Sequence, residues 1–132
     1  MKLRLVSVLL LAGVCLFSGC GALLLGGAAA TGGAAGAYVW LNEEMKTDYY
    51  APFDKTWTAV EKTVAGLHGT KVEPVREISQ GMINTLIDDE KVRISVTYKE
   101  RNVTSVAVRV GTVGNKLSSQ LIHDRISENL KK

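Results

Sequence analysis

The polar part of this sequence lacks cysteine. Both cysteines of the 132-residue chain, Cys15 and Cys20, lie in its uncharged N-terminal part, so no disulfide can stabilise the remainder. The same absence excludes a cysteine nucleophile and cysteine metal ligands there. Histidine is scarce too: His68 and His123 stand alone in different predicted helices, without a second histidine at metal-ligand spacing. We therefore expect both at a helix surface or helix end, and neither a metal nor a cofactor.

Charged residues are absent from residues 5–41, and all 13 acidic residues come later. Lys2 and Arg4 are two of the 16 basic residues, which leaves 14 basic against 13 acidic residues after residue 41. That part is nearly neutral and lacks the positive field that nucleic-acid binding requires. The chain therefore divides near residue 42 into an apolar N-terminal part and a polar domain.

The N-terminal part has the three-part layout of a secretory signal. A short basic start, Met1 to Arg4, precedes an apolar stretch that ends at Phe17, and the small residues Ser18 and Gly19 follow. A signal peptidase requires small side chains beside the bond that it cleaves. Cleavage is therefore expected after residue 19.

The stretch "FSGC", residues 17–20, resembles the lipobox of bacterial lipoproteins. In that family the cysteine receives a diacylglycerol, the preceding peptide is removed, and the new amino group is often acylated. The resemblance implies a signal peptide over residues 1–19, diacylglycerol and N-acyl chains on Cys20, and recognition of Phe17, Ser18 and Gly19 by the peptidase. Gly21 stands where aspartate would resemble an inner-membrane retention signal, which favours the outer membrane with the domain facing the periplasm.

Residues 20–45 comprise the lipidated cysteine and a Gly/Ala-rich, membrane-proximal segment, and three interpretations of residues 21–41 remain open. The first is a flexible tether. The second is a helix inserted beside the acyl chains, with Tyr38 and Trp40 at the headgroup level. Small residues at every fourth position, Ala28, Gly32 and Gly36, would let such helices approach closely. The third is an uncleaved single-pass or hairpin anchor.

Residues 46–132 are predicted to form one small α+β domain. Strands are expected at residues 47–51, 72–78, 82–87, 91–98 and 103–110, with Gly81 in the turn before the third. Apolar residues three or four apart predict two helices: Phe53, Trp57, Val60, Val64 and Leu67 in the first, and Leu117, Leu121, Ile122, Ile126 and Leu130 in the second. The order β-α-β-β-β-β-α predicts a two-layer sandwich, with a mostly antiparallel sheet of about five strands and both helices on one face.

The domain also resembles a family of small bacterial lipoproteins whose shared domain has no assigned function. The segments "YYAPFDKTW", "VRISVTYKE" and "VAVRVGTVGN" carry this resemblance. It implies the same anchor and the same fold. It supplies no catalytic residue.

The remaining polar clusters are better explained by structure than by chemistry. Asp88, Asp89 and Glu90 lack the alternating ligands and the glycine of a calcium loop and are expected in a hairpin turn. Residues 111–116 lack the ending of a phosphate loop and are expected to form a turn and a helix entry. Trp57 is expected in the core. Tyr49, Tyr50 and Tyr98 could line a cleft.

The sequence thus favours a membrane-anchored lipoprotein of the cell envelope with a non-enzymatic binding or structural domain. Its partners would be the membrane, through the lipid anchor, and another envelope protein or component, through a sheet edge or the solvent-facing side of the sheet. The alternative is a carrier or sensor of a small apolar ligand or lipid. An enzyme has the least support, because no paired acid and base, nucleophile or metal set is present.

Overall fold

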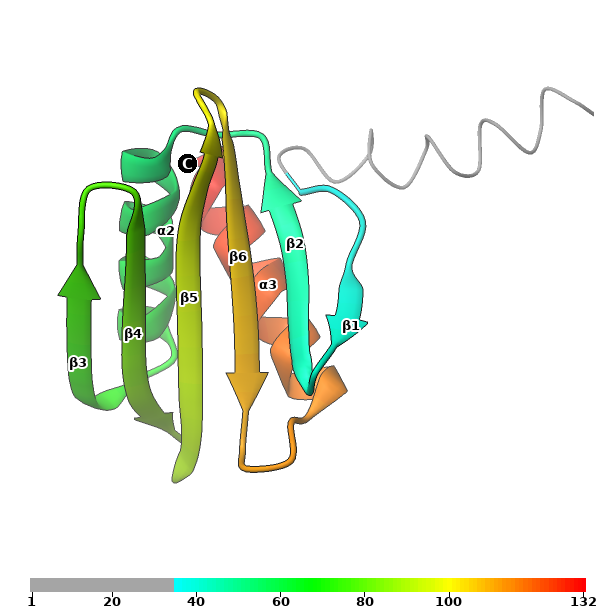
Figure 1. The fold of residues 1–132 in the computed structure, drawn as a ribbon. Helices are drawn as coiled ribbons and strands as arrows, with labels where there is room; N and C mark the ends of the chain where they lie inside the picture. Colours follow the sequence, from blue (N-terminus) through cyan, green and yellow to red (C-terminus); the bar gives the residue numbers. More distant parts are fainter. Residues whose placement is uncertain (1–34) are drawn as a thin grey trace, which may run out of the picture. The chain divides into compact units, whose positions relative to one another are not determined.

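The structure, a computed structural model, describes residues 35–132. They form one antiparallel sheet with two helices packed on one face (Figure 1). The strands are β1 (Val39–Leu41), β2 (Glu44–Tyr49), β3 (Thr70–Arg76), β4 (Gln80–Ile87), β5 (Glu90–Glu100) and β6 (Val103–Val110); the helices are α2 (Phe53–Gly66) and α3 (Lys116–Lys131). The predicted two-layer α+β fold is confirmed.

The sheet has six strands rather than about five, because β1 was not expected. The sequence placed residues 39–41 in the membrane-proximal segment. In the structure they pair with β2 through a two-residue turn at Asn42 and Glu43, where φ is 52° and 65°. Positive φ at both turn positions gives the twist that suits a tight hairpin.

The strand order is β1-β2-β6-β5-β4-β3. Strands β3 to β6 form the expected meander, whereas β2 pairs with β6 at the opposite side from β3. Helix α2 therefore carries the chain across the sheet (Figure 1). Edge strand β3 is exposed along its whole length, contains Pro74 and has a register shift between Thr70 and Glu73.

The core lies between the sheet and the two helices. The predicted alternation is confirmed on β5 and β6, where three inward pairs face each other: Val92 with Val110, Ile94 with Val108, and Val96 with Val106. Four of the five residues predicted for the apolar stripe of α2 are buried: Phe53, Trp57, Val60 and Val64. The fifth, Leu67, follows the helix and is partly buried against the core.

Helix α3 is rotated relative to the prediction. Leu117 and Leu121 are 79% and 53% exposed, although the sequence placed them on the apolar stripe. The buried face is instead made of residues three or four apart that include polar side chains: Ser119, Ile122, His123, Ile126, Ser127 and Leu130. The apolar stripe predicted for this helix is therefore correct only for Ile122, Ile126 and Leu130.

Gly81 is not a turn residue, contrary to the prediction. The β3–β4 connection occupies residues 77–79, and Gly81 lies within β4 opposite Val96. A Cβ atom on Gly81 would lie 2.2 Å from Cζ3 of Trp57. The absence of a side chain thus lets the indole of α2 lie directly on the strand.

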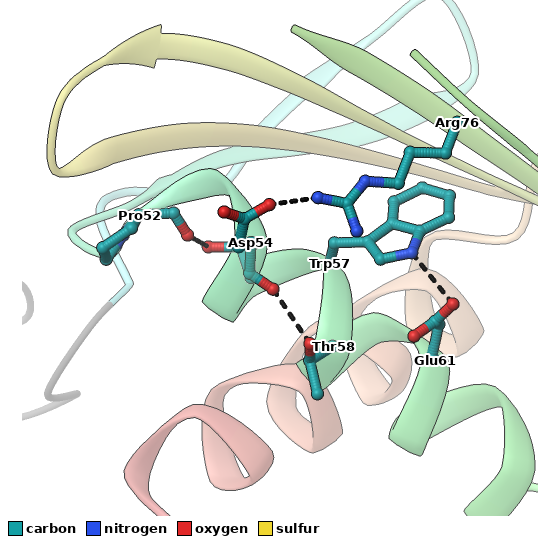
Figure 2. A network of polar contacts seen from close by, with 7 residues as sticks. Pro52, Asp54, Trp57, Thr58, Glu61 and Arg76 are labelled. Carbon is teal, nitrogen blue, oxygen red and sulfur yellow. Dashed lines mark hydrogen bonds and ion pairs between the residues drawn. The ribbon is translucent and has the colours of Figure 1, made fainter. Parts of the chain in front are cut away.

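The Trp57 indole is held from both ends (Figure 2). Its Nε1 donates to Oε1 of Glu61, one turn later in α2, at 2.9 Å. On the sheet side, the Arg76 guanidinium lies 5.4 Å from the Phe53 ring centroid and 5.7 Å from that of Trp57. Arg76 also forms an ion pair with Asp54. These contacts fix α2 against β3 and β4.

Candidate functional site

The face of the sheet opposite the helices, called the outer face below, carries no covering layer among residues 35–132 (Figure 1). Strand alternation directs the other set of side chains to it. Across the middle of the sheet, Val75 stands opposite Met82, Met82 opposite Ser95, Ser95 opposite Ala107, and Ala107 opposite Lys46. The small side chains of Ser95 and Ala107 make the centre of this face lower than its margins, where larger side chains stand.

A cavity of about 630 Å³ lies at one end of the outer face. Four cations, Lys71, Lys91, Arg93 and Arg109, contribute to its lining, against one acidic residue, Glu73. We call it the cationic hollow. Arg93 and Arg109 are directly paired across β5 and β6, an arrangement of like charges that by itself is unfavourable.

The two arginines of the cationic hollow differ in their surroundings. Arg109 donates to Oε2 of Glu43 at 2.5 Å and to the carbonyl oxygen of Thr112. Arg93, by contrast, projects into solvent with its side chain exposed. Lys71 stands at a backbone φ of 48°, at the irregularity of β3. An acidic group entering the hollow would therefore meet cations from three strands.

A second hollow of about 330 Å³ lies farther along the outer face, toward the β3–β4 connection. Val75 and Met82 form its apolar side, and Ser95 and Thr97 contribute polar groups. The outer face thus offers a positively charged end and a more apolar end.

The prediction that His123 lies at a helix surface or helix end is wrong, because its side chain is completely buried. Its Nε2 lies 2.8 Å from the backbone carbonyl oxygen of Met45 and donates to it, since a carbonyl can only accept. In the neutral ring Nδ1 then accepts from the Tyr49 hydroxyl at 2.8 Å. The same hydroxyl lies 3.0 Å from the His123 carbonyl oxygen. His123 therefore joins α3 to β2 through two polar contacts.

The protonation states of this group follow from burial. Desolvation lowers the pKa of His123 to about 4, against a smaller opposing effect of the hydrogen bond to Met45. Burial likewise raises the pKa of Tyr49, and it raises the pKa of Tyr38, whose hydroxyl donates to Asp124, to about 12. All three rings are neutral at pH 7. A neutral histidine without solvent access serves as a structural link between elements.

The sequence did contain a signal for this burial. His123 lies four residues after Ser119 and three before Ile126, on the same face as the buried apolar residues of α3. What it could not show is the partner, because Tyr49 is 74 residues away along the chain.

The model of the family of proteins of unknown function DUF3568 matches residues 3–129. The chain belongs to this family. No curated protein matches it.

In this DUF3568 domain the other predicted polar residues occupy structural positions. Asp88 and Asp89 form the β4–β5 hairpin turn at φ of 51° and 63°, and Glu90 begins β5, as expected. His68 lies exposed just after α2. Within residues 35–132 no cluster of three metal-ligating His, Cys, Asp or Glu side chains occurs.

The tyrosines of the DUF3568 domain do not gather at one cleft. Tyr49 is buried against His123, whereas Tyr50 and Tyr98 are exposed. Trp57 is buried in the core, as predicted. The turn that precedes α3 also agrees with the prediction, because the Asn115 side chain caps the helix by accepting from the backbone N–H of Ser118 at 3.0 Å.

The residues of the expected anchor, Phe17, Ser18, Gly19 and Cys20, lie outside the described part of the DUF3568 chain. The described helices include none that is long and apolar enough to cross a bilayer.

Proposed function

We propose that this protein is a lipid-anchored, non-enzymatic binding module of the bacterial cell envelope. Acyl chains on Cys20 would hold it at the outer membrane, facing the periplasm, and the outer face of its sheet would contact another envelope component. The cationic hollow on a sheet face without a covering layer carries this proposal. Its cations fit a partner that presents acidic groups.

The anchor is supported by the arrangement of residues around Cys20. A basic start, an uncharged apolar stretch and two small residues precede this cysteine. One acyl chain holds a protein at a bilayer only marginally, whereas two or more chains hold it durably. Diacylglycerol plus an N-acyl chain therefore suffices for retention without a spanning helix.

Replacing Cys20 with alanine tests the anchor. Wild-type protein is expected to begin at residue 20 and to carry the mass of its acyl chains, whereas Cys20→Ala should remain a precursor that begins at Met1 and lacks them. Intact-mass spectrometry of the membrane and soluble fractions measures both properties. Cys15→Ala is the matched control and should behave as the wild type. Equal masses and equal membrane retention for Cys20→Ala and wild type would refute lipidation.

The structure favours the outer face over the sheet edge as the contact. Pro74 and the register shift interrupt the hydrogen-bonding row of edge strand β3, which makes strand addition there unfavourable. At the other edge, β1 has only three residues. The outer face, in contrast, presents the exposed Arg93 and the two hollows described above.

A photo-crosslinking residue at Thr97, which lines the second hollow, tests the contact in intact cells. We expect one dominant protein adduct, and we expect the added substitution Arg93→Glu to reduce it at least several-fold by reversing charge in the cationic hollow. The control crosslinker replaces Lys62, which is exposed on α2 in the opposite layer. Equal adducts from both positions would argue against an outer-face contact.

The alternative function, a carrier or sensor of a small apolar ligand, is favoured by one observation. The second hollow has an apolar side formed by Val75 and Met82. The space between sheet and helices is occupied by the core. A low-mass lipid adduct at Thr97 in place of a protein adduct would support this alternative.

A further inference from the structure

Exposed apolar side chains gather where β1 meets the start of α3. Leu117 and Leu121 of α3 project into solvent, and Trp40 of β1 is 36% exposed. Tyr38, just before β1, is 38% exposed and lies on the same side of the sheet as Trp40. Together Tyr38, Trp40, Leu117 and Leu121 are called the β1–α3 patch.

The contacts of Tyr38 bring the two elements together. Its hydroxyl donates to Oδ1 of Asp124 at 3.1 Å, and its ring centroid lies 5.4 Å from that of His123. Leu121 and Leu117 stand about one and two helical turns before Asp124 on the same face of α3. Trp40 is on the same side of β1 as Tyr38, since strand side chains alternate.

The chain from Tyr38 along β1 runs antiparallel to α3. From Tyr38, β1 leads to the turn at Asn42 and Glu43. That turn packs against Gly114, where an added Cβ would lie 2.4 Å from the Glu43 carbonyl oxygen. Since Gly114 immediately precedes Asn115, the cap of α3, the turn that ends β1 lies beside the start of this helix (Figure 1).

The chain and the charges around the patch indicate what covers it. Cys20 is only 15 residues before Ala35, where the described chain begins, and Tyr38 follows three residues later, so the patch lies close to the lipid anchor along the chain. Tryptophan and tyrosine favour the lipid–water boundary. The nearby carboxylates of Asp124 and Glu43 are engaged by Tyr38 and Arg109, and Lys116 adds a cation beside Leu117. The charge of Glu43 is balanced by Arg109, whereas Asp124 keeps its negative charge because the Tyr38 hydroxyl is neutral.

We propose that the β1–α3 patch is a membrane-docking surface that seats the domain on the bilayer carrying the acyl chains of Cys20. The inference rests on the proposed lipid anchor. The occupant is the lipid–water interface, into which Trp40, Leu117 and Leu121 insert their side chains. Because β1 is an edge of the sheet, the outer face remains open beside the membrane.

Fluorescence quenching tests the docking. Full-length acylated protein is reconstituted in phosphatidylethanolamine–phosphatidylcholine vesicles whose acyl chains carry bromine near the headgroup. Of the two tryptophans in the chain, Trp57 is buried in the core and Trp40 lies in the patch. We expect the emission of Trp40 to fall by about half, as an interfacial indole should. Trp40→Phe should remove the quenchable component.

Two exposed pairs provide matched variants. Leu117→Ser with Leu121→Ser should reduce the quenching at least two-fold without shifting the thermal unfolding midpoint, because both side chains are exposed. Val75→Ser with Met82→Ser, exposed near the opposite edge, should leave it unchanged. Vesicle flotation and intact mass report the anchor separately. Acylated, vesicle-bound protein whose Trp40 is not quenched would overturn the docking and leave the proposed function intact.

Discussion

Gly81→Ala is expected to destabilise the domain by about 3 kcal/mol, near the upper end for overpacking by a single methyl group. The added Cβ would lie 2.2 Å from Cζ3 and 2.8 Å from Cε3 of Trp57. The indole cannot easily withdraw, since Glu61 holds its Nε1 and Arg76 lies over its ring. Urea unfolding followed by circular dichroism measures the loss.

A second substitution shows whether the indole causes this effect. Trp57→Leu alone should cost about 3 kcal/mol, because it leaves a cavity in the core. The double variant should lose at least about 1 kcal/mol less than the two single losses together, since leucine leaves room for the new methyl group. Gly66→Ala is the control: no atom lies within 4 Å of its added Cβ, and alanine is the better helix former. Additive losses at positions 57 and 81 would contradict the proposed packing.

Acidification is expected to weaken the domain through His123. Its pKa is about 4 in the folded state and 6.5 without the fold. Between pH 6.5 and 4 the unfolded chain therefore binds a proton that the folded domain does not, so the free energy of unfolding falls as the pH falls. The contribution of His123 is complete above pH 6.5 and is lost by pH 4, a change of about 3 kcal/mol at most.

Unfolding free energies at pH 7 and pH 4.5 measure this loss, with His123→Gln as the comparison. The variant should be less stable at pH 7, because the link between Met45 and Tyr49 is broken, but it should lose much less on acidification. The Asp48 carboxyl does not confound the range: its hydrogen bond from Lys99 lowers its pKa below 3.8, so its own contribution is lost only at lower pH. A stability equal at both pH values in the wild type would disprove a buried neutral His123.

The sequence predicts those parts of the fold that local patterns determine. The stripe from Phe53 to Val64 and the alternation along β5 and β6 each state which side chains face the core, and the structure confirms them. Strand β1 was missed, since residues 39–41 follow a long Gly/Ala-rich stretch and obtain their structure from pairing with β2.

Non-local contacts explain the errors on α3 and β4. Two faces of α3 could have been buried: an apolar one with Leu117 and Leu121, and a mixed one with Ser119 and His123. The mixed face is buried because His123 bonds to Tyr49, which is distant in the sequence. Gly81 resembled a turn residue, because nothing near it in sequence announces that Trp57 lies over its Cα. The cationic hollow likewise combines residues from separate strands.

The interrupted edge of β3 would have a consequence for the lipid-anchored protein proposed above. Molecules anchored in one bilayer diffuse in two dimensions and collide often, which favours ordered aggregation wherever a regular strand edge is free. Proline 74 and the left-handed backbone at Lys71 deny an incoming strand a continuous template. If the proposed anchor holds the domain at high density on a bilayer, edge-to-edge assembly through β3 is therefore unfavourable.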